Sequence, residues 1–316
     1  YHSLFRAGDM RESGIRLIPR MIPRGGVVFD IGAHIGKFVV LAAGAVGRSG
    51  RIYAFEPVRW PRSVMSRMVW LRRLRQVQVV ACGLSDRAGD ASIRIPLKRG
   101  GLPMYMLAHL SANDSSDEGI VRETIALQTL DGFCSSAGID RLDFIKCDVE
   151  GAEWKVFSGG RLALSQFRPT IFCEVVEDFS RRNATNSGSL FALLKDLGYR
   201  SYQADEAGDA LIAVSGYRNP GDYFFIHADR LGDFAGVPDV DPDIGPPIPL
   251  PRYTPPMAPT APNLPRGSRA TRPNPRDATL ELHAERLIAA HDLLPQTGPL
   301  LVGVSGGPDS AALLHF

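Results

Sequence analysis

The chain has 316 residues, a formal net charge of +2 and 44% hydrophobic residues, which is ordinary for a globular protein of one large domain or two modest ones. The near-neutral charge implies no strong electrostatic partner, and nothing in the sequence resembles a polybasic tail for nucleic acid or membrane. No run of about 18 apolar residues predicts a transmembrane helix. The four cysteines form no CxxC pair, and no apolar signal region opens the chain, so we expect free thiols in a cytoplasmic protein.

Up to about residue 235, short apolar runs alternate with segments that have apolar residues at helical spacing. The predicted buried strands cover residues 25–34, 51–57, 77–85, 142–151 and 169–176, and the predicted helices cover 37–47, 62–74, 153–164 and 189–199. More polar strands are expected at 90–97 and 121–130, and three short strands at 199–205, 209–215 and 222–228. This alternation predicts an α/β fold of Rossmann-like type, with a mostly parallel central sheet and helices on both faces.

A glycine-containing loop joins the first predicted strand to the first helix. In VFDIGAHIGKF, Asp30, Gly32 and Gly36 form the pattern D-x-G-x-x-x-G. Glycine allows a left-handed backbone and close approach of a ligand, and the helix start presents free N–H groups. Many strand–helix turns need glycine only for packing. His34 lies in the same loop and is either a ligand contact or an ordinary polar loop residue.

The second predicted strand ends in Glu56, about twenty residues after the last glycine of the loop. An acid at this place can accept hydrogen bonds from ribose hydroxyls, which fits either NAD or S-adenosylmethionine (SAM). The three-residue gap between the glycines favours SAM over NAD. We then expect the carboxylate of Asp30 to attract the ammonium group of SAM, directly or through water.

The predicted strand LDFIKCDVEG ends in a cluster of charged residues. Lys146, Asp148, Glu150 and Glu153 lie at or just after the carboxyl end of this strand, where open α/β sheets bind ligands. Asp148 or Glu150 could orient an acceptor or act as a general base, and Lys146 could pair with these acids. Two acids could instead hold a divalent cation, although we assign no metal ligand. Capping of the next helix is the alternative role for Glu150 and the favoured one for Glu153.

Four other residues are weaker candidates for a site. Glu174 ends the strand PTIFCEV at the same edge of the sheet, and Ser85 and Asp86 follow the third strand, where adenine contacts are usual in SAM-binding folds. His109 lies in an inserted region that could cover an acceptor, where a histidine base would be chemically suitable. An exposed loop histidine is the commoner explanation.

Four of these stretches together resemble the FkbM-type SAM-dependent methyltransferases over roughly residues 25–230. The stretches are VVFDIGAHIGKF, RIYAFEP, LDFIKCDVEGAEWKVFSGG and RPTIFCEV, and the block Asp148–Glu153 is the most specific of them. The resemblance implies a methyltransferase domain at residues 1–235 with SAM as cofactor. It also implies methyl transfer to a hydroxyl of a sugar or natural-product-like acceptor, a small molecule or glycan.

A proline-rich segment follows the predicted methyltransferase domain. Residues 236–277 hold about half of the chain's 24 prolines, so we expect a disordered linker without sheet ladders or helices. Residues 278–316 then end in a predicted strand, the loop SGGPDS and a helix start.

The loop SGGPDS resembles the PP-loop of ATP pyrophosphatases, and its surroundings resemble the start of tRNA(Ile)-lysidine synthetase. The resemblance implies an incomplete second module whose ATP contacts would be Ser305, Gly306, Gly307, Asp309 and Ser310. ATP and tRNA would then be partners only of a completed module. The rival interpretations are this tRNA-modifying ligase, a SAM-fold interaction module without activity, and an NAD enzyme.

Overall fold

The computed structural model describes residues 13–96, 109–110, 120–206, 208, 210–234 and 248–249. All of them belong to the unit that spans Glu12–Thr254. Among these residues, no helix is both long enough and apolar enough to cross a membrane.

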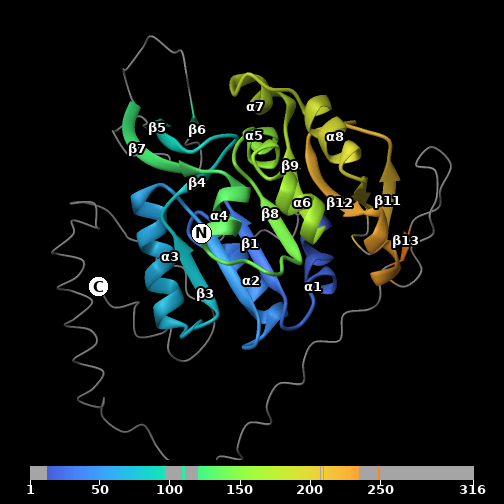
Figure 1. Cartoon of the computed structure of the whole chain (residues 1–316), viewed down its shortest axis with the longest axis horizontal. Helices are drawn as coiled ribbons and strands as arrows, with labels where there is room; N and C mark the ends of the chain where they lie inside the picture. Colours follow the sequence, from blue (N-terminus) through green and yellow to red (C-terminus); the bar gives the residue numbers. More distant parts are fainter. Residues whose placement is uncertain are drawn as a thin grey trace, which may run out of the picture. The chain divides into compact units, whose positions relative to one another are not determined.

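Nine strands form the central sheet, in the order β13-β11-β10-β12-β9-β8-β1-β2-β3 (Figure 1). The parallel part consists of β1 (Val27–Ile31), β2 (Arg51–Phe55), β3 (Val77–Val80), β8 (Phe144–Cys147) and β9 (Thr170–Val175). An antiparallel extension consists of β12 (Gly221–His227), β10 (Tyr199–Ala204), β11 (Ala210–Val214) and β13 (Ile248–Pro249). The prediction of a Rossmann-like, mostly parallel sheet is confirmed.

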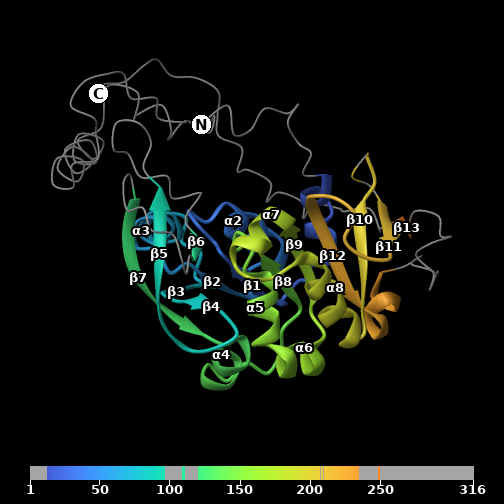
Figure 2. The same cartoon turned by 90° about the horizontal axis from the view of Figure 1, so that it is seen from above.

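Helices cover both faces of the sheet, which Figure 2 shows in edge view. One face carries α1 (Ile18–Met21), α2 (Lys37–Val46) and α3 (Arg59–Leu71), after the 3₁₀ turn Ser13–Arg16. The other face carries α4 (Leu130–Ser136), α5 (Glu153–Ser158), α6 (Arg161–Phe167) and α8 (Ser187–Asp196). Helix α7 (Glu177–Arg182) follows β9, and a 3₁₀ turn at Ala228–Asp233 follows β12.

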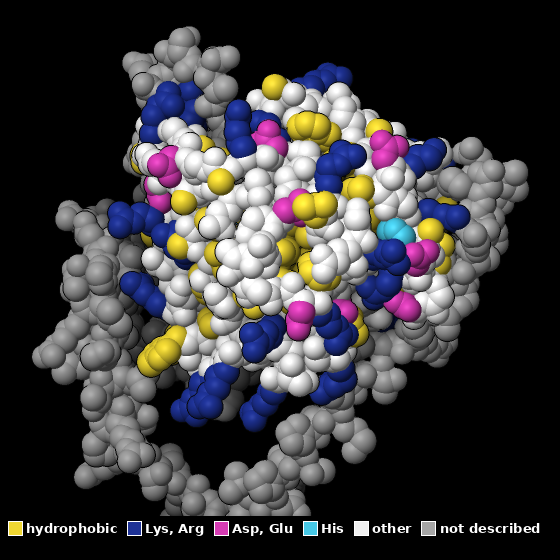
Figure 3. All heavy atoms as spheres, viewed as in Figure 1, with side chains coloured by type: hydrophobic (Ala, Val, Ile, Leu, Met, Phe, Trp, Pro, Cys, Tyr) yellow, Lys and Arg dark blue, Asp and Glu magenta, His cyan; other side chains and the backbone are white. Residues whose placement is uncertain are grey.

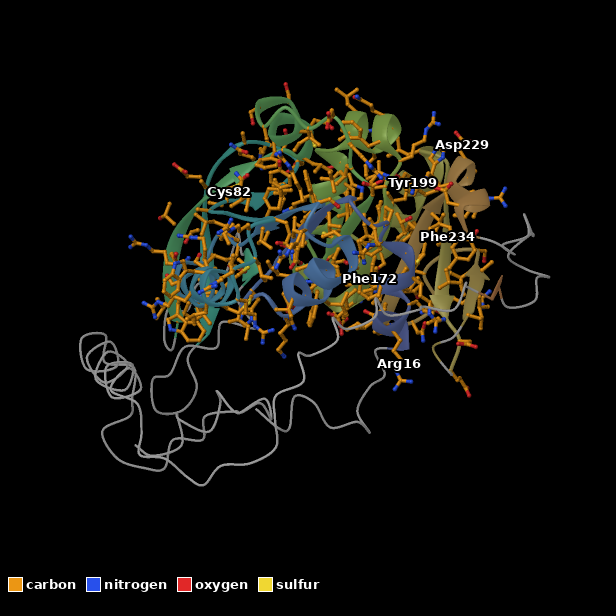
Figure 4. The ribbon with its side chains drawn as sticks, turned by 90° about the horizontal axis from the view of Figure 1, so that it is seen from below. Arg16, Cys82, Phe172, Tyr199, Asp229 and Phe234 are labelled. Atoms are coloured by element: carbon orange, nitrogen blue, oxygen red, sulfur yellow. The ribbon has the colours of Figure 1, made fainter. Side chains whose placement is uncertain are left out.

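Alternation along each strand divides the apolar side chains between two cores. In β1, Phe29 and Ile31 pack with α4 and α5, whereas Val28 packs with α2. In β9, the ring of Phe172 lies 4.8 Å from that of Phe224, on the face that α1 covers. Figure 4 shows Phe172 inside the molecule and Arg16 pointing away from it. Both faces of the parallel strands are therefore buried, as their continuous apolar sequence requires.

A second, four-stranded sheet lies beside α3 (Figure 2). It consists of β4 (Gly83–Leu84), β7 (Ile120–Gln128), β5 (Gly89–Pro96) and β6 (His109–Leu110). Ile93, Ile95 and Ile125 pack on Val58, which lies in the loop after β2. The two predicted polar strands at 90–97 and 121–130 are thus confirmed, and they form an antiparallel pair.

The structure corrects two of the predicted elements and adds two helices. The expected third strand at 77–85 is interrupted after Val80, because Gly83 and Leu84 pair with β7 in the second sheet. The expected helix at 153–164 is two helices, because the glycine pair at 159–160 ends α5 and precedes α6; a β-carbon at Gly159 would lie 2.2 Å from the carbonyl oxygen of Ser85. Helices α4 and α7 were not predicted, and the side chain of Thr129 caps the start of α4.

The expectation of a linker without sheet structure is wrong at two residues. Ile248 and Pro249 form β13, antiparallel to Leu211 and Ala210 of β11. Proline is tolerated here because β13 is an edge strand, whose outward N–H groups need no partner. The rest of 236–277 and all of 278–316 lie outside the described residues, and with them the predicted ATP contacts at 305–310.

Candidate active site

The candidate site lies where the strand order of the central sheet reverses, between β1 and β8. From β1 the chain passes through α2 to β2 on one side, whereas β8 pairs with β1 on the other side. Ligands of open α/β sheets bind at such a switch point, outside the carboxyl ends of the strands. The carboxyl ends of β1 and β8 carry Asp30, Gly32, Lys146 and Asp148, so the structure brings these four predicted residues together.

Gly32 allows the two loops at this switch point to meet. Its φ is +77°, and a β-carbon there would lie 1.9 Å from the backbone carbonyl oxygen of Asp148. The N–H groups of Gly32 and Ala33 donate to the carbonyl oxygen of Phe55 over 3.1 and 2.9 Å, and the N–H of Asp148 donates to Ile31 over 3.0 Å. The glycine loop is therefore tied to both neighbouring strands.

Gly36 has a packing role in this structure. It adopts φ +86° at the start of α2, and a β-carbon there would lie 2.7 Å from Met68 Cε and 2.9 Å from Met65 Cγ of α3. The second glycine of the pattern thus permits close contact between α2 and α3. This observation favours the packing alternative for Gly36 over direct contact with a ligand.

Lys146 links the two acids of the switch point. Its Nζ lies 3.1 Å from Asp148 Oδ2 and 3.7 Å from Asp30 Oδ1, and it donates to the carbonyl oxygen of Gly32 over 3.3 Å. Asp30 and Lys146 are paired in register on adjacent strands, so their side chains share one face of the sheet. The predicted pairing of Lys146 is confirmed for Asp148, whereas its ion pair with Asp30 was not predicted.

Burial makes this trio electrostatically unusual. Asp30 has no exposed surface and neither of its oxygens has a hydrogen-bond partner, so burial raises its pKa to about 6 despite the nearby Lys146. Burial lowers the pKa of Lys146, but the negative charges of Asp148 and Asp30 have the larger combined effect and raise it. The side chain of Asp148 is 38% exposed. Asp148 is therefore the member of the trio that a ligand can reach.

Glu56 stands at the end of β2, as predicted, but its carboxylate already accepts two hydrogen bonds from backbone N–H groups. Oε2 accepts the N–H of His34 over 2.8 Å, and Oε1 accepts the N–H of Val58 over 2.8 Å. Burial raises the pKa of Glu56 to about 7, against these two hydrogen bonds. An ionised carboxylate has about four lone-pair sites, so both oxygens can still accept a hydroxyl donor. Glu56 thus shapes the glycine loop as well as facing the site.

His34 adopts φ +50°, an uncommon value for a residue with a side chain. Its Nε2 is buried without a hydrogen-bond partner, and burial lowers the pKa of the imidazole. The backbone of His34, rather than its side chain, contacts Glu56. A neutral imidazole beside Lys37 and the Lys146 ammonium is consistent with both the ligand-contact and the loop-residue interpretations.

The loop after β8 contains two further acids with different roles. Oε1 of Glu153 accepts the N–H groups of Val149 and Gly151 over 3.2 Å each, so this first residue of α5 holds the loop before the helix, and its role as a helix cap stays a prediction. Burial raises the pKa of Glu153 to about 7. Glu150 adopts φ +54°, and its pKa is raised to about 7 by burial and by the charges of Asp148, Glu174 and Glu153. Glu150 is thus a strained, partly buried acid next to Asp148.

Glu174 lies on β9 and faces the edge that carries Asp148. Its register partner on the antiparallel strand β12 is Asp222, a residue that was missed in the sequence. The alternating pattern of the segment 222–228 would have placed Asp222 on one face, but it could not show that β12 lies next to β9. No group of three or more His, Cys, Asp or Glu among the described residues is arranged to hold a metal ion, so the divalent-cation expectation finds no support there.

Ser85 and Asp86 lie elsewhere in the fold. Because they follow β4 and not the third central strand, their loop packs against the turn between α5 and α6. The hydroxyl of Ser85 donates to Asp86 Oδ1 over 3.0 Å. The expected adenine contact thus rests on a strand assignment that is wrong. His109 lies on β6, but its side chain is outside the described residues.

A family model described as the methyltransferase FkbM domain matches residues 30–201, which run from the glycine loop to the start of β10. The chain is 25% identical over 224 residues to the AMB antimetabolite synthetase AmbE of Pseudomonas aeruginosa, covering 61% of this chain and 10% of AmbE. It is 28% identical over 161 residues to the methyltransferase sdnD of Sordaria araneosa, and 29% identical over 153 residues to the 2-O-methyltransferase NoeI of Sinorhizobium fredii.

The matched regions cover 44% and 45% of this chain, and 61% and 60% of sdnD and NoeI. Among solved structures, an FkbM methyltransferase from Methylobacillus flagellatus aligns with 18% identity and a TM-score of 0.41, over 70% of this chain and 46% of that one. A SAM-dependent O-methyltransferase from Thermotoga maritima aligns with 13% identity and a TM-score of 0.37, over 69% and 64% of the two chains.

Proposed function

Because the chain belongs to the methyltransferase FkbM family, and is a SAM-dependent methyltransferase, we propose that it transfers the methyl group of SAM to a hydroxyl oxygen. The acceptor class that we propose is a sugar or a natural-product-like molecule. The 2-O-methyltransferase NoeI, a relative over 45% of this chain, supports oxygen as the acceptor atom. AmbE, which is named an antimetabolite synthetase, supports a natural-product setting.

The observation that carries the proposal is the pairing of Gly32 with Asp148 at the switch point. Gly32 allows the loops after β1 and β8 to meet, and the partly exposed Asp148 stands beside it after the next strand. The buried carboxylate of Asp30 has no hydrogen-bond partner and only the Lys146 ammonium near it, and it also fits SAM, because it offers negative charge near a ligand that carries an ammonium group. We assign Asp30 an indirect role, through Lys146 or a water, because it has no exposed surface.

Glu56 would hold the ribose of SAM. Its two oxygens each keep capacity for a hydroxyl donor, and the hydrogen bond to His34 fixes the loop that carries Gly32. Binding of SAM therefore depends on an ionised Glu56, and the raised pKa predicts weaker binding below about pH 7.

Asp148 and Glu150 would act on the acceptor. Bound SAM supplies an electrophilic methyl group, so the protein needs only to position the hydroxyl and take up its proton. Asp148 is held by Lys146 and orients the hydroxyl, whereas Glu150 has the pKa near 7 that suits a general base. Lys146 is a positioning residue in this scheme.

The test uses the full chain with SAM that carries a ¹³C-labelled methyl group. Monosaccharides, polyols and amines are offered separately, and NMR of the product distinguishes a methyl on oxygen from a methyl on nitrogen. Oxygen-bound label from a hydroxyl acceptor supports the proposal, and label found only on amines contradicts it.

Calorimetry with SAM and with ATP complements this test. We expect SAM binding that Glu56→Gln weakens by at least about tenfold, since one charge-assisted hydrogen bond contributes about 1.5–3 kcal/mol. ATP binding without SAM binding would instead favour the C-terminal PP-loop as the working site.

A further inference from the structure

One face of the molecule is basic although the whole chain is nearly neutral. Residues 31–85 contain nine Lys and Arg residues and a single acid, Glu56, which is 5% exposed. Helix α3 lies in the middle of this stretch, and no acidic residue occurs between positions 57 and 85. The positive charge is therefore concentrated on the side of the sheet that α2 and α3 cover.

Two large apolar side chains protrude from this basic surface. Trp70 is 77% exposed and Leu71 is 70% exposed, and both belong to the last turn of α3. Arg67 precedes them on the helix, and Arg72, Arg73 and Arg75 follow at once. Figure 3 shows dark-blue side chains gathered around protruding yellow ones over this end of α3, at the lower left of the view.

The neighbouring elements add charge at the same place. Ile52 of β2 donates to the carbonyl oxygen of Gln76, and the side chain of Gln76 reaches the carbonyl oxygen of Ala43 in α2. Arg51 and Arg48 are exposed at this junction. We call the whole set the α3 basic face: Arg48, Arg51, Arg67, Trp70, Leu71, Arg72, Arg73 and Arg75.

The arginines of the α3 basic face are not used inside the fold. Within the described part of the chain, none of their six guanidinium groups forms an ion pair with a carboxylate. By contrast, Arg62 on the inner side of α3 donates to the carbonyl oxygens of Glu56 and Pro57. The outer arginines and the two apolar side chains thus remain available to bind a partner outside the described fold.

We propose that the α3 basic face docks on an anionic phospholipid surface. Trp70 and Leu71 project from the helix end, so they suit insertion among headgroups better than capture of a ligand in a cavity. Tryptophan favours the membrane–water interface, and arginines around it pair with lipid phosphates. A nucleic acid would use the arginines and stack on Trp70, but it would leave Leu71 in water.

Such docking would leave the candidate active site accessible. Helix α3 begins just after the loop that carries Glu56, and Trp70 lies roughly 16 Å further along the helix. The inference does not depend on the acceptor or on the residue roles proposed above, because none of the α3 basic face residues belongs to that site.

The test is co-sedimentation of the full chain with two kinds of vesicle, phosphatidylcholine alone and phosphatidylcholine mixed with phosphatidylglycerol. We expect the chain to pellet with the mixed vesicles only, and the bound fraction to fall as salt screens the charges. The double variant Trp70→Ser/Leu71→Ser should lower the partition coefficient by at least about tenfold. Arg72→Gln/Arg73→Gln should lower it too and should flatten its dependence on salt.

Leu162→Ser is the matched control. Leu162 is 73% exposed, follows Arg161 and lies on α6, on the opposite face of the sheet, so its loss should leave vesicle binding unchanged. Thermal unfolding of each variant checks that the exposed substitutions leave the fold intact. Three results would overturn the proposal: no binding to mixed vesicles, unaltered binding by Trp70→Ser/Leu71→Ser, or binding of single-stranded RNA in place of vesicles.

Discussion

The backbone carbonyl oxygen of Asp148 occupies the space that a side chain at residue 32 would need, 1.9 Å from the β-carbon position of Gly32. The loops that follow β1 and β8 therefore fit together only with glycine at this position. The contact joins the predicted cofactor loop to the predicted acceptor residue, so a substitution that moves one loop should also displace the other.

Gly32→Ala should disrupt this contact. The positive φ and the clash with backbone atoms together predict a loss of stability of about 3 kcal/mol or more, together with loss of SAM binding. Urea unfolding and calorimetry measure the two effects. Gly44→Ala is the control, since a β-carbon in the middle of α2 meets nothing within 4 Å and should stabilise the chain by about 0.5–1 kcal/mol. Equal stability of the two variants would contradict the prediction.

Lys146→Met should destabilise the fold by about 3–5 kcal/mol, because it leaves the fully buried Asp30 without its nearest cation. The free energy of unfolding from urea titration measures this loss. Adding Asp30→Asn removes the unpaired charge, so the double variant should recover a large part of the stability. A loss below about 1 kcal/mol in the single variant would show that Asp30 does not depend on the lysine.

Glu150→Gln should lower kcat by about 10²-fold or more if Glu150 is the general base. The pKa of Glu150 is raised to about 7, so the wild-type rate should rise with pH through about 7, as the carboxylate forms. The variant should lose this inflection in kcat. Its SAM binding should still weaken at low pH, because Glu56 is unchanged.

Asp178→Asn on α7 removes an exposed acid in the neighbourhood and serves as the control. A kcat profile that is the same in Glu150→Gln as in the wild type would exclude Glu150 as the base. In that case Asp148 is the remaining acid of the two proposed to act on the acceptor.

Glu153 should make the fold less stable as the pH rises. Its pKa in the folded chain is about 7 because of burial, against an ordinary value of 4.5. The folded state thus holds the proton more tightly, so the stabilising contribution is complete below 4.5 and is lost as the pH rises through 7. The difference corresponds to about 3 kcal/mol.

Glu153→Gln keeps a carbonyl oxygen to accept the N–H groups of Val149 and Gly151 but cannot titrate. Unfolding free energies at about pH 5 and about pH 8 should therefore differ less in the variant than in the wild type. An unchanged difference would mean that other buried acids, such as Glu56, account for the pH dependence.

Much of the architecture could be predicted from local pattern. The apolar runs around Val28, Ile52 and Phe144 are strands because both of their faces are buried, and the carboxyl ends of parallel strands meet at one edge. That rule alone brings Asp30, Gly32 and Asp148 together. The place of Glu153 in the first turn of a helix was also predicted from the sequence.

Other features depend on contacts between segments far apart in the sequence. The contact between Ser85 and Gly159 joins two distant segments, and Asp222 reaches the edge beside Glu174 because β12 inserts between β9 and β10. The two N–H groups that occupy Glu56 likewise depend on how the loops at His34 and Val58 fold back. Periodicity and strand-end chemistry, which are local, were sufficient for the fold class and the central site residues. Strand order and hydrogen-bond partners were decided only by tertiary packing, because they depend on which distant surfaces fit together.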